Sequence, residues 1–319
     1  MPLPNDEKVV ALANSLLAQF DAIFGQHPGY RAAHAKGAML QGIFTPSEQA
    51  KSLSRAPHFR RESTPVTVRF SNSTGVPVIP DNDANANPRG IAIRFHLADR
   101  VHTDIVAHST DGFPVHTGEE FLEFLRARMA SDPSQPSPTP VEQFLASHPA
   151  ALAFVQTPKP APSSFARETY FGVTAMKFSN EAWAARYGRY RIVPIAGNDH
   201  LSAEAVAAKS PNYLFDELQE RIAAGEIKFR VLVQLAEDDD VVNDATIHWP
   251  ADRELLELGT IVLTAPVAND AAEQQHIIFD PIPRVDGIDP SDDPLLELRA
   301  AIYLISGRRR RSAPLVAAS

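Results

Sequence analysis

The chain of 319 residues contains no cysteine. This absence excludes disulfides, thiolate nucleophiles, cysteine-ligated zinc, iron–sulfur clusters and covalently attached c-type haem. Any bound metal must therefore be held by nitrogen or oxygen ligands. Polar aromatic residues are also scarce, since 6 tyrosines and 2 tryptophans stand against 17 phenylalanines. Most of the aromatic mass needs no buried hydrogen-bond partner, which suits a dry pocket.

Several motifs that announce common activities are missing as well. The sequence has no G-x-S-x-G elbow, no H-E-x-x-H helix, no phosphate-binding G-x-x-x-x-G-K and no G-x-G-x-x-G fingerprint. Hydrolase, metalloprotease and nicotinamide-enzyme interpretations lose their main support. No apolar run reaches the ~18 residues of a membrane span, and the N-terminus lacks a secretory leader. We therefore expect a cytoplasmic protein without a membrane span.

Basic residues are fewer than acidic ones, with 30 Lys and Arg against 39 Asp and Glu. The formal net charge is −9, which argues against nucleic acid as a partner. The one basic run is Arg308 to Arg311, which is read either as a solvated helix end or as a targeting or nucleic-acid patch. The composition favours the solvated helix end.

Hydrophobic periodicity predicts an α+β fold. Alternation with a period of two predicts strands at 66–71, 90–96, 103–108, 169–178, 187–195, 227–236, 258–264 and 274–279. A helical period is found at 5–25, 118–130, 141–155, 202–224 and 294–306. So many strands with few βα alternations favour an antiparallel barrel over about 65–280, with inserted and flanking helices. We expect one domain over residues 1–319.

Three segments contain residue types that could serve a redox metal without cysteine. They read R-A-A-H-A-K-G-A at 31–38, V-R-F-S-N-S-T-G at 68–75 and R-A-A-I-Y at 299–303. Taken alone, a single histidine or a tyrosine on an apolar helix is more often structural. The combination, with an arginine in each segment, is what calls for a chemical interpretation.

These segments resemble the haem catalase family, and N-P-R-G-I-A-I-R-F at 87–95 resembles a further strand of that family. The motifs follow the family's order from about residue 29 to 311. The resemblance implies a catalase-type barrel around a buried haem b. It also implies that Tyr303 is the proximal iron ligand, with Arg299 beside its phenolate. The propionates would bind three arginines, Arg31, Arg69 and Arg310.

On the other face of the haem, the resemblance makes His34 the group that moves a proton between the two peroxide oxygens. Ser71 would orient the imidazole, and Ala33 would let the ring lie close to the haem. Phe113 and Phe121 match aromatic positions of the family's pocket. Where the family has an asparagine in G-N-N-T, this chain has His108 in A-H-S-T. His108 either polarises the peroxide, with the added ability to titrate, or merely fills the site.

By comparison with the family, we expect the protein to lack the wrapping segment and the C-terminal helical region. Without these segments we expect a haem pocket that is open to larger molecules. In this feature and in having His108, the chain resembles the small catalase-related peroxidases. We expect a peroxidase that reduces hydrogen peroxide or organic hydroperoxides with a small organic reductant and has weak catalase activity. The alternatives are an allene-oxide-synthase-like rearrangement of hydroperoxides and a non-enzymatic haem-binding protein. Family members are commonly oligomeric, and a homodimer is the expectation here.

Overall fold

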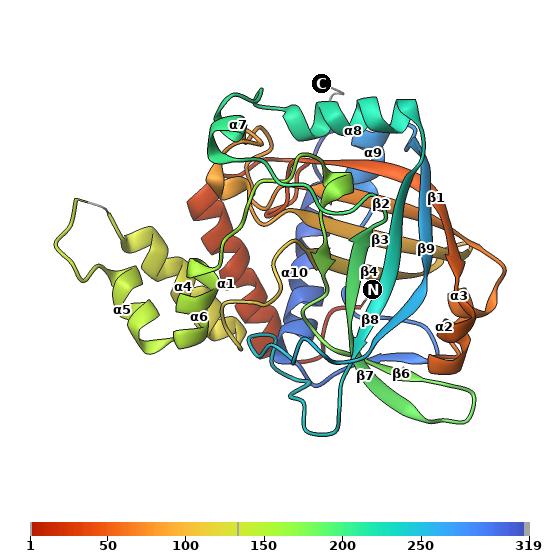
Figure 1. Cartoon of the computed structure of the whole chain (residues 1–319). Coiled ribbons are helices and arrows are strands. Elements are labelled where there is room, and N and C mark those ends of the chain that lie inside the picture. Colours follow the sequence, from red (N-terminus) through yellow and green to blue (C-terminus); the bar gives the residue numbers. More distant parts are fainter. Residues whose placement is uncertain (1, 133, 316–319) are drawn as a thin grey trace.

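The computed structural model describes residues 2–132 and 134–315. Within these residues, eight antiparallel strands form a closed barrel in which β7 and β8 pair to complete the ring (Figure 1). Around the ring they are β1 (Gly37–Pro46), β2 (Thr64–Ser71), β3 (Gly90–Ala98), β4 (Val101–His108), β5 (Tyr170–Phe171), β7 (Ala185–Pro194), β8 (Ile227–Leu235) and β9 (Leu255–Pro266). Two short strands extend the sheet beyond β7: β6 (Met176–Ser179) and β10 (Ile288–Pro290). The predicted α+β antiparallel barrel is confirmed.

Alternation along the strands separates the barrel core from a functional outer surface. In β2, Val68 and Phe70 point inward and join the main hydrophobic core. Arg69 and Ser71 then point outward, although both are only 3% exposed. Something outside the barrel must cover this face, because polar side chains on an open sheet face would be solvated.

Helices supply that cover. The N-terminal helix α1 (Glu7–Phe24) and the C-terminal helix α10 (Pro294–Arg311) pack side by side outside the barrel. The short helix α9 (Asp270–His276) packs near the end of α10. A wing of three helices, α4 (Gly118–Ala130), α5 (Pro140–Ser147) and α6 (Pro149–Gln156), projects beyond α1 in Figure 1. Four further α-helices lie elsewhere among the described residues: α2 (Glu48–Leu53), α3 (Pro57–Arg60), α7 (Ala203–Ala207) and α8 (Tyr213–Ala224). Two 3-10 turns lie at 84–86 and 165–167.

Several predicted boundaries were wrong. The segment 274–279 is not a strand, because residues up to His276 belong to α9 and the chain leaves it in a loop. The predicted helices at 141–155 and 202–224 are each two helices, divided before Pro149 and around Pro211, because proline cannot continue a helix from the preceding turn. The predicted strand at 169–178 is the separate pair β5 and β6. Strand β1 was not predicted.

No helix in the described ranges, 2–132 and 134–315, is long and apolar enough to cross a membrane.

Candidate active site

Three neighbouring strands place Ser71, Gly90 and His108 in one row on the outer face of the barrel. Ser71 pairs with Gly90 between β2 and β3, and Gly90 pairs with His108 between β3 and β4. Because directly opposed residues point to the same face, the serine and the histidine flank a position without a side chain. Gly90 therefore leaves room between them.

The imidazole of His34 fills that room. Its Nδ1 lies 3.0 Å from Ser71 Oγ. A Cβ atom on Gly90 would stand 2.6 Å from Ser71 Oγ and 2.7 Å from His34 Nδ1, so any larger residue would displace the ring. Gly90 was not among the predicted site residues. The available signal was a glycine at the start of a strand, which indicates a close approach of another group.

The backbone of His34 is held in an uncommon conformation. Its φ angle is +56°, in the left-handed region that L-residues seldom adopt. Hydrogen bonds on both sides hold it there, because its N–H donates to Ser73 O at 3.0 Å and its carbonyl accepts from Arg69 Nη2 at 2.8 Å. Such strain persists only where surrounding contacts impose it, as in binding and reaction sites.

Burial keeps both histidines of the site uncharged at neutral pH. It lowers the pKa of His34 to about 3, and the nearby charge of Arg69 adds to the effect. Burial also lowers the pKa of His108 to about 4, with smaller contributions from Arg299 and Lys159. The N–H of Thr110 donates to His108 Nδ1 at 3.3 Å. This bond places the proton of His108 on Nε2, where it can be donated to a ligand.

Three arginines from distant segments meet beside His34. Arg31 and Arg310 donate through Nη2 to one acceptor, the carbonyl of Ile277, at 3.1 and 2.6 Å. Arg69 donates through Nε to Gln274 Oε1 at 2.7 Å. The loop after α1, strand β2 and helix α10 thus contribute one guanidinium each, and α9 with the residue after it supplies the acceptors.

The arginine group carries more positive charge than its surroundings balance. Burial lowers the pKa of Arg69 to about 9 and that of Arg310 to about 10. Burial also lowers the pKa of Arg31, and the charges of Arg69 and Arg310 lower it further, while Asp270 acts in the opposite direction. Buried charges require opposite charges. One carboxylate beside three guanidinium groups leaves a site suited to two further carboxylates.

Tyr303 and Arg299 lie one turn apart on α10. Arg299 Nη2 lies 3.4 Å from the Tyr303 hydroxyl oxygen, at the long end of hydrogen-bond distances. Tyr303 is within electrostatic range of Arg31, and Arg299 is within that range of His108. The helix therefore brings a phenol to the same region as the arginines and the histidines.

The remaining predicted pocket residues surround this region. Ala33 is half-buried directly before His34. The rings of Phe113 and Phe121 pack on each other with centroids 5.2 Å apart, and Phe121 also meets Phe20 of α1 at 6.3 Å. These rings belong to an apolar cluster that continues into the wing.

The basic run at the end of α10 is largely accounted for within the fold. Arg309 pairs with Asp21 of α1 at 2.6 Å, and Arg311 Nε donates to the carbonyl of His276 at 2.8 Å. Arg310 is only 3% exposed and faces the arginine group, whereas Arg308 is exposed. The run is therefore mainly a structural helix end rather than a free cationic patch.

No cluster of three or more His, Asp or Glu side chains suited to a metal ion occurs in the ranges 2–132 and 134–315. Among the donors gathered at this site, the Tyr303 oxygen is the one that becomes an anionic metal ligand on losing its proton.

Comparison with known proteins gives a consistent result. A family model described as Catalase matches residues 16–315. A protein of Mycolicibacterium paratuberculosis named "Catalase-related peroxidase" is 34% identical over 289 residues, which cover 90% of this chain and 90% of that protein. A protein of Synechococcus elongatus with the same name is 33% identical over 302 residues, or 93% of this chain and 88% of its own length.

Larger relatives match over part of their length. "Catalase isozyme 2" of Cucurbita pepo is 30% identical, and the chain spans 60% of it. The crystal structure of a fungal catalase superposes with a TM-score of 0.78 at 24% identity, covering 97% of this chain and 64% of that one. Catalase A from Saccharomyces cerevisiae gives a TM-score of 0.77 at 23% identity, covering 97% and 65%. These two likenesses concern the fold.

Proposed function

The chain belongs to the catalase family, and we propose that it is a haem b-dependent peroxidase that reduces hydrogen peroxide or organic hydroperoxides with electrons from an organic donor. The observation that carries the proposal is the convergence of a neutral histidine, three arginines and a tyrosine on one outer face of the barrel. The names of the two relatives of similar length support a peroxidase function.

The residues present fit haem by charge and donor type. Three guanidinium groups and Asp270 leave two positive charges unbalanced, and haem b carries two propionate carboxylates. Arg31, Arg69 and Arg310 would bind those propionates, and Tyr303 would ligate the iron as a phenolate that Arg299 stabilises. Phe113 and Phe121 would border the ring. Haem supplies the redox chemistry that breaks the O–O bond and stores the oxidising equivalents.

His34 moves the proton. At neutral pH its imidazole is uncharged, because burial holds its pKa near 3. With Nδ1–H donating to Ser71 Oγ, Nε2 is free to accept a proton from one peroxide oxygen and to return it to the departing oxygen, which leaves as water. Ser71 acts by fixing the ring orientation.

His108 polarises the peroxide as a neutral donor. Because Thr110 N–H donates to Nδ1 of His108, the imidazole proton is on Nε2, which can donate it to a ligand. A neutral imidazole N–H can then replace the amide N–H of an asparagine. With a pKa near 4, His108 stays uncharged at neutral pH rather than titrating there. The weak catalase activity, the cytoplasmic location and the homodimer stay predictions.

The direct test is a peroxide titration of the haem-loaded protein with and without an organic reductant such as guaiacol. We expect peroxide to change the haem absorption band, and the donor to restore it with two electrons consumed per peroxide. Release of oxygen at a rate unaffected by donor would contradict the peroxidase assignment. Failure of the pure protein to take up haem would contradict the whole proposal.

A further inference from the structure

The segment that joins α6 to the 3-10 turn at 165–167 passes close to the row formed by Ser71, Gly90 and His108. The carbonyl of Lys159 in this segment accepts a hydrogen bond from Asn87 Nδ2 at 3.2 Å. The carbonyl of Asn87 in turn accepts from Ser73 Oγ at 2.9 Å. Because Ser73 O binds the N–H of His34, Lys159 is connected to the backbone of His34 through only two residues.

Lys159 carries a charge that no carboxylate balances. Its ammonium donates to two backbone carbonyls, Phe154 O at 2.6 Å and Thr157 O at 3.0 Å, and lies 4.5 Å from the centroid of the Phe154 ring. Among the described residues, no acidic side chain forms an ion pair with it. An ammonium has three donors, so one is left for another acceptor.

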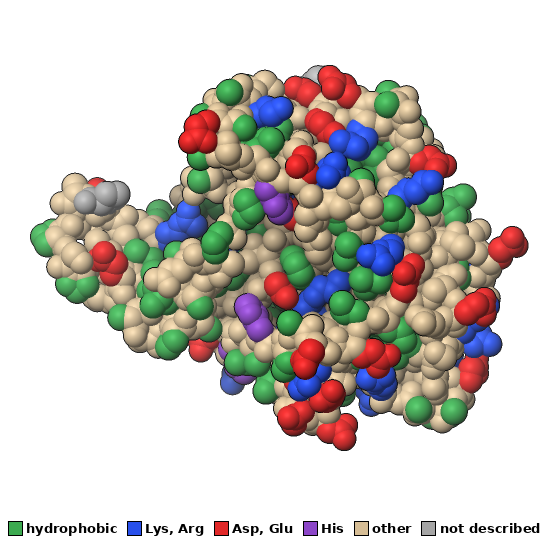
Figure 2. Space-filling view, in the orientation of Figure 1, with side chains coloured by type: hydrophobic (Ala, Val, Ile, Leu, Met, Phe, Trp, Pro, Cys, Tyr) green, Lys and Arg blue, Asp and Glu red, His purple; other side chains and the backbone are tan. Residues whose placement is uncertain are grey.

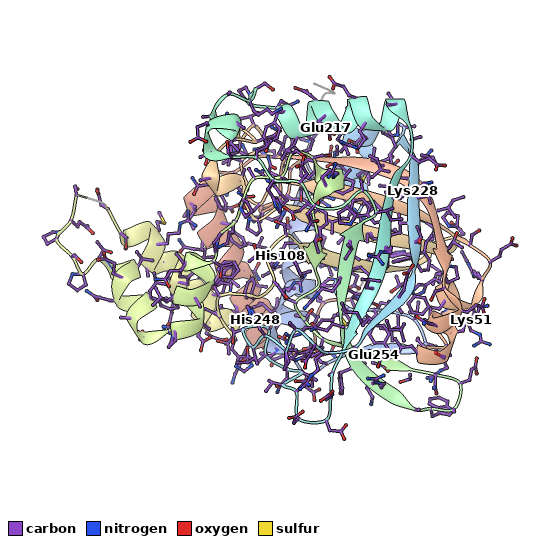
Figure 3. The ribbon with its side chains drawn as sticks, viewed as in Figure 1. Lys51, His108, Glu217, Lys228, His248 and Glu254 are labelled. Carbon is purple, nitrogen blue, oxygen red and sulfur yellow. The ribbon has the colours of Figure 1, made fainter. Side chains whose placement is uncertain are left out.

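The positive charge of Lys159 acts on His108, which lies on the side of the site where peroxide would react. It lies within electrostatic range of His108, whose pKa it helps to lower. Figure 3 labels His108 between the helical wing and the barrel strands, and the face shown in Figure 2 is hollowed between these two parts. A negatively charged group bound near His108 would therefore be attracted by this cation.

Apolar surface accompanies that cation. The cluster that contains Phe113 and Phe121 continues to Phe144 and Ala151 of the wing. On α6, Leu152 and Val155 are 37% and 48% exposed. A hydrocarbon body would be favoured along this surface, and a negatively charged end would be favoured at the ammonium.

We propose that Lys159 binds the carboxylate of an apolar organic acid and thereby makes such acids preferred substrates over their neutral esters. The proposal rests on the proposed function, since it names the substrate class of the same site. The acid serves either as the hydroperoxide or as the electron donor, and both share the chemistry of an apolar body with one carboxylate. Lys159 also has a structural role, since its ammonium caps carbonyls at the end of α6. A purely structural role would not make the protein prefer an acid over its ester.

Binding is tested first, with haem-loaded protein and decanoate or methyl decanoate as probes in calorimetry. We expect decanoate to bind about tenfold more tightly than the ester, as one charge-assisted hydrogen bond provides. The variant Lys159→Gln should lose this preference, and Lys159→Arg should keep it. Lys228→Gln is the matched control. Lys228 lies on β8, away from His108, and its substitution by glutamine removes the same charge as Lys159→Gln. Equal affinity for acid and ester in the wild type would overturn the proposal.

Turnover then identifies which substrate the lysine serves. One arm compares a fatty-acid hydroperoxide with its methyl ester, using a neutral donor. The other uses hydrogen peroxide with ferulate or methyl ferulate as donor. An acid-to-ester ratio of kcat/KM near ten in one arm, falling to about one in Lys159→Gln, supports the proposal. An unchanged ratio in that variant contradicts it. Absence of all peroxide turnover would instead contradict the proposed function, and decanoate binding would still test Lys159.

Discussion

At the scale of single residues, the site depends on histidines that stay neutral. His34 and His108 are half-buried and border several positive charges, so burial and these charges both disfavour protonation of either ring. The hydrogen bond from His34 Nδ1–H to Ser71 Oγ and the one from Thr110 N–H to His108 Nδ1 then decide which ring nitrogen of each histidine is available. One imidazole is left as an acceptor and the other as a donor, which is what cleavage of a peroxide requires.

Replacing His34 by alanine should retain haem and abolish efficient peroxide cleavage. We expect the rate of reaction with hydrogen peroxide to fall about 10²–10⁴-fold, the range for losing a general acid–base group. Stopped-flow absorption at the haem band measures this rate. His96→Ala, which removes an exposed imidazole from the same barrel, is the control. A normal rate in the His34 variant would assign that residue a structural role only.

The substitution His108→Asn restores the residue found at this position in the resembling motif. We expect more oxygen release per peroxide, because the amide is the hydrogen-bond donor that the resembling catalase motif has at this position. An oxygen electrode measures the change. The same oxygen yield in both proteins would mean that His108 merely fills space.

His58 lies outside the site and titrates with a consequence for stability. It is 1% exposed, its Nδ1 has no hydrogen-bond partner among the residues that the structure describes, and its ring packs on Phe59 and Phe95 with centroids 4.1 and 4.8 Å away. Burial lowers its pKa to about 3. Below about pH 6.5, His58 therefore binds a proton in the unfolded chain but stays uncharged in the folded chain. The free energy of unfolding consequently decreases as the pH falls from about 6.5 toward 3.

The substitution His58→Phe should remove this acid sensitivity. Between pH 7.5 and 4.5 we expect the variant to lose about 2–3 kcal/mol less unfolding free energy than the wild type, from about 1.4 kcal/mol per unit of pKa shift. Urea unfolding at the two pH values measures it. Overpacking by phenylalanine would shift stability equally at both pH values. The same pH dependence in both proteins would refute the assignment.

At the scale of elements, the pairing register of β2, β3 and β4 builds the reacting face. Ser71, Gly90 and His108 are brought into one row by two antiparallel pairings, and a shift by one residue would turn all of them into the barrel core. Gly90 matters most in this row, because the absence of a side chain lets the His34 imidazole pack directly on the backbone of β3.

Replacing Gly90 by alanine should disturb His34 without removing haem ligands. The new Cβ would force the imidazole away from Ser71, and a misplacement of about 1 Å costs about 10²-fold in rate. We expect haem uptake to remain normal and peroxide cleavage to fall by that order. Gly225→Ala is the control, because a Cβ there meets no atom of residues 2–132 or 134–315 within 4 Å. Equal rates in the two variants would contradict the role of Gly90.

Local sequence predicted some elements better than others. The alternation in V-R-F-S gave β2 with Arg69 and Ser71 on the correct common face. Strand β1 was missed because its burial does not alternate, with Met39 and Leu40 buried in succession. The apolar stretch at 277–279 favoured a strand, although the preceding residues form α9. That error concealed Gln274 and the Ile277 carbonyl, which hold the arginines.

At the scale of the whole molecule, the site exists only when distant parts of the chain meet. Arg31 follows α1, Arg69 lies in the barrel and Arg310 ends α10. No local pattern states that these three converge, because their convergence depends on the packing of α10 against α1 and α9. The family resemblance predicted this set, while the acceptors, the role of Gly90 and the position of Lys159 required the structure.

The most direct test of the central claim is the absorption spectrum of Tyr303→Phe after incubation with haem. The substitution removes one oxygen atom and leaves the aromatic ring in place on α10. The control is Tyr187→Phe, which removes the hydroxyl of a tyrosine on β7 that is not among the site residues. The account predicts that the wild type and this control develop a strong haem band, while Tyr303→Phe loses the band or binds haem far more weakly, with unchanged circular dichroism. A normal spectrum and undiminished haem affinity in Tyr303→Phe would contradict the account.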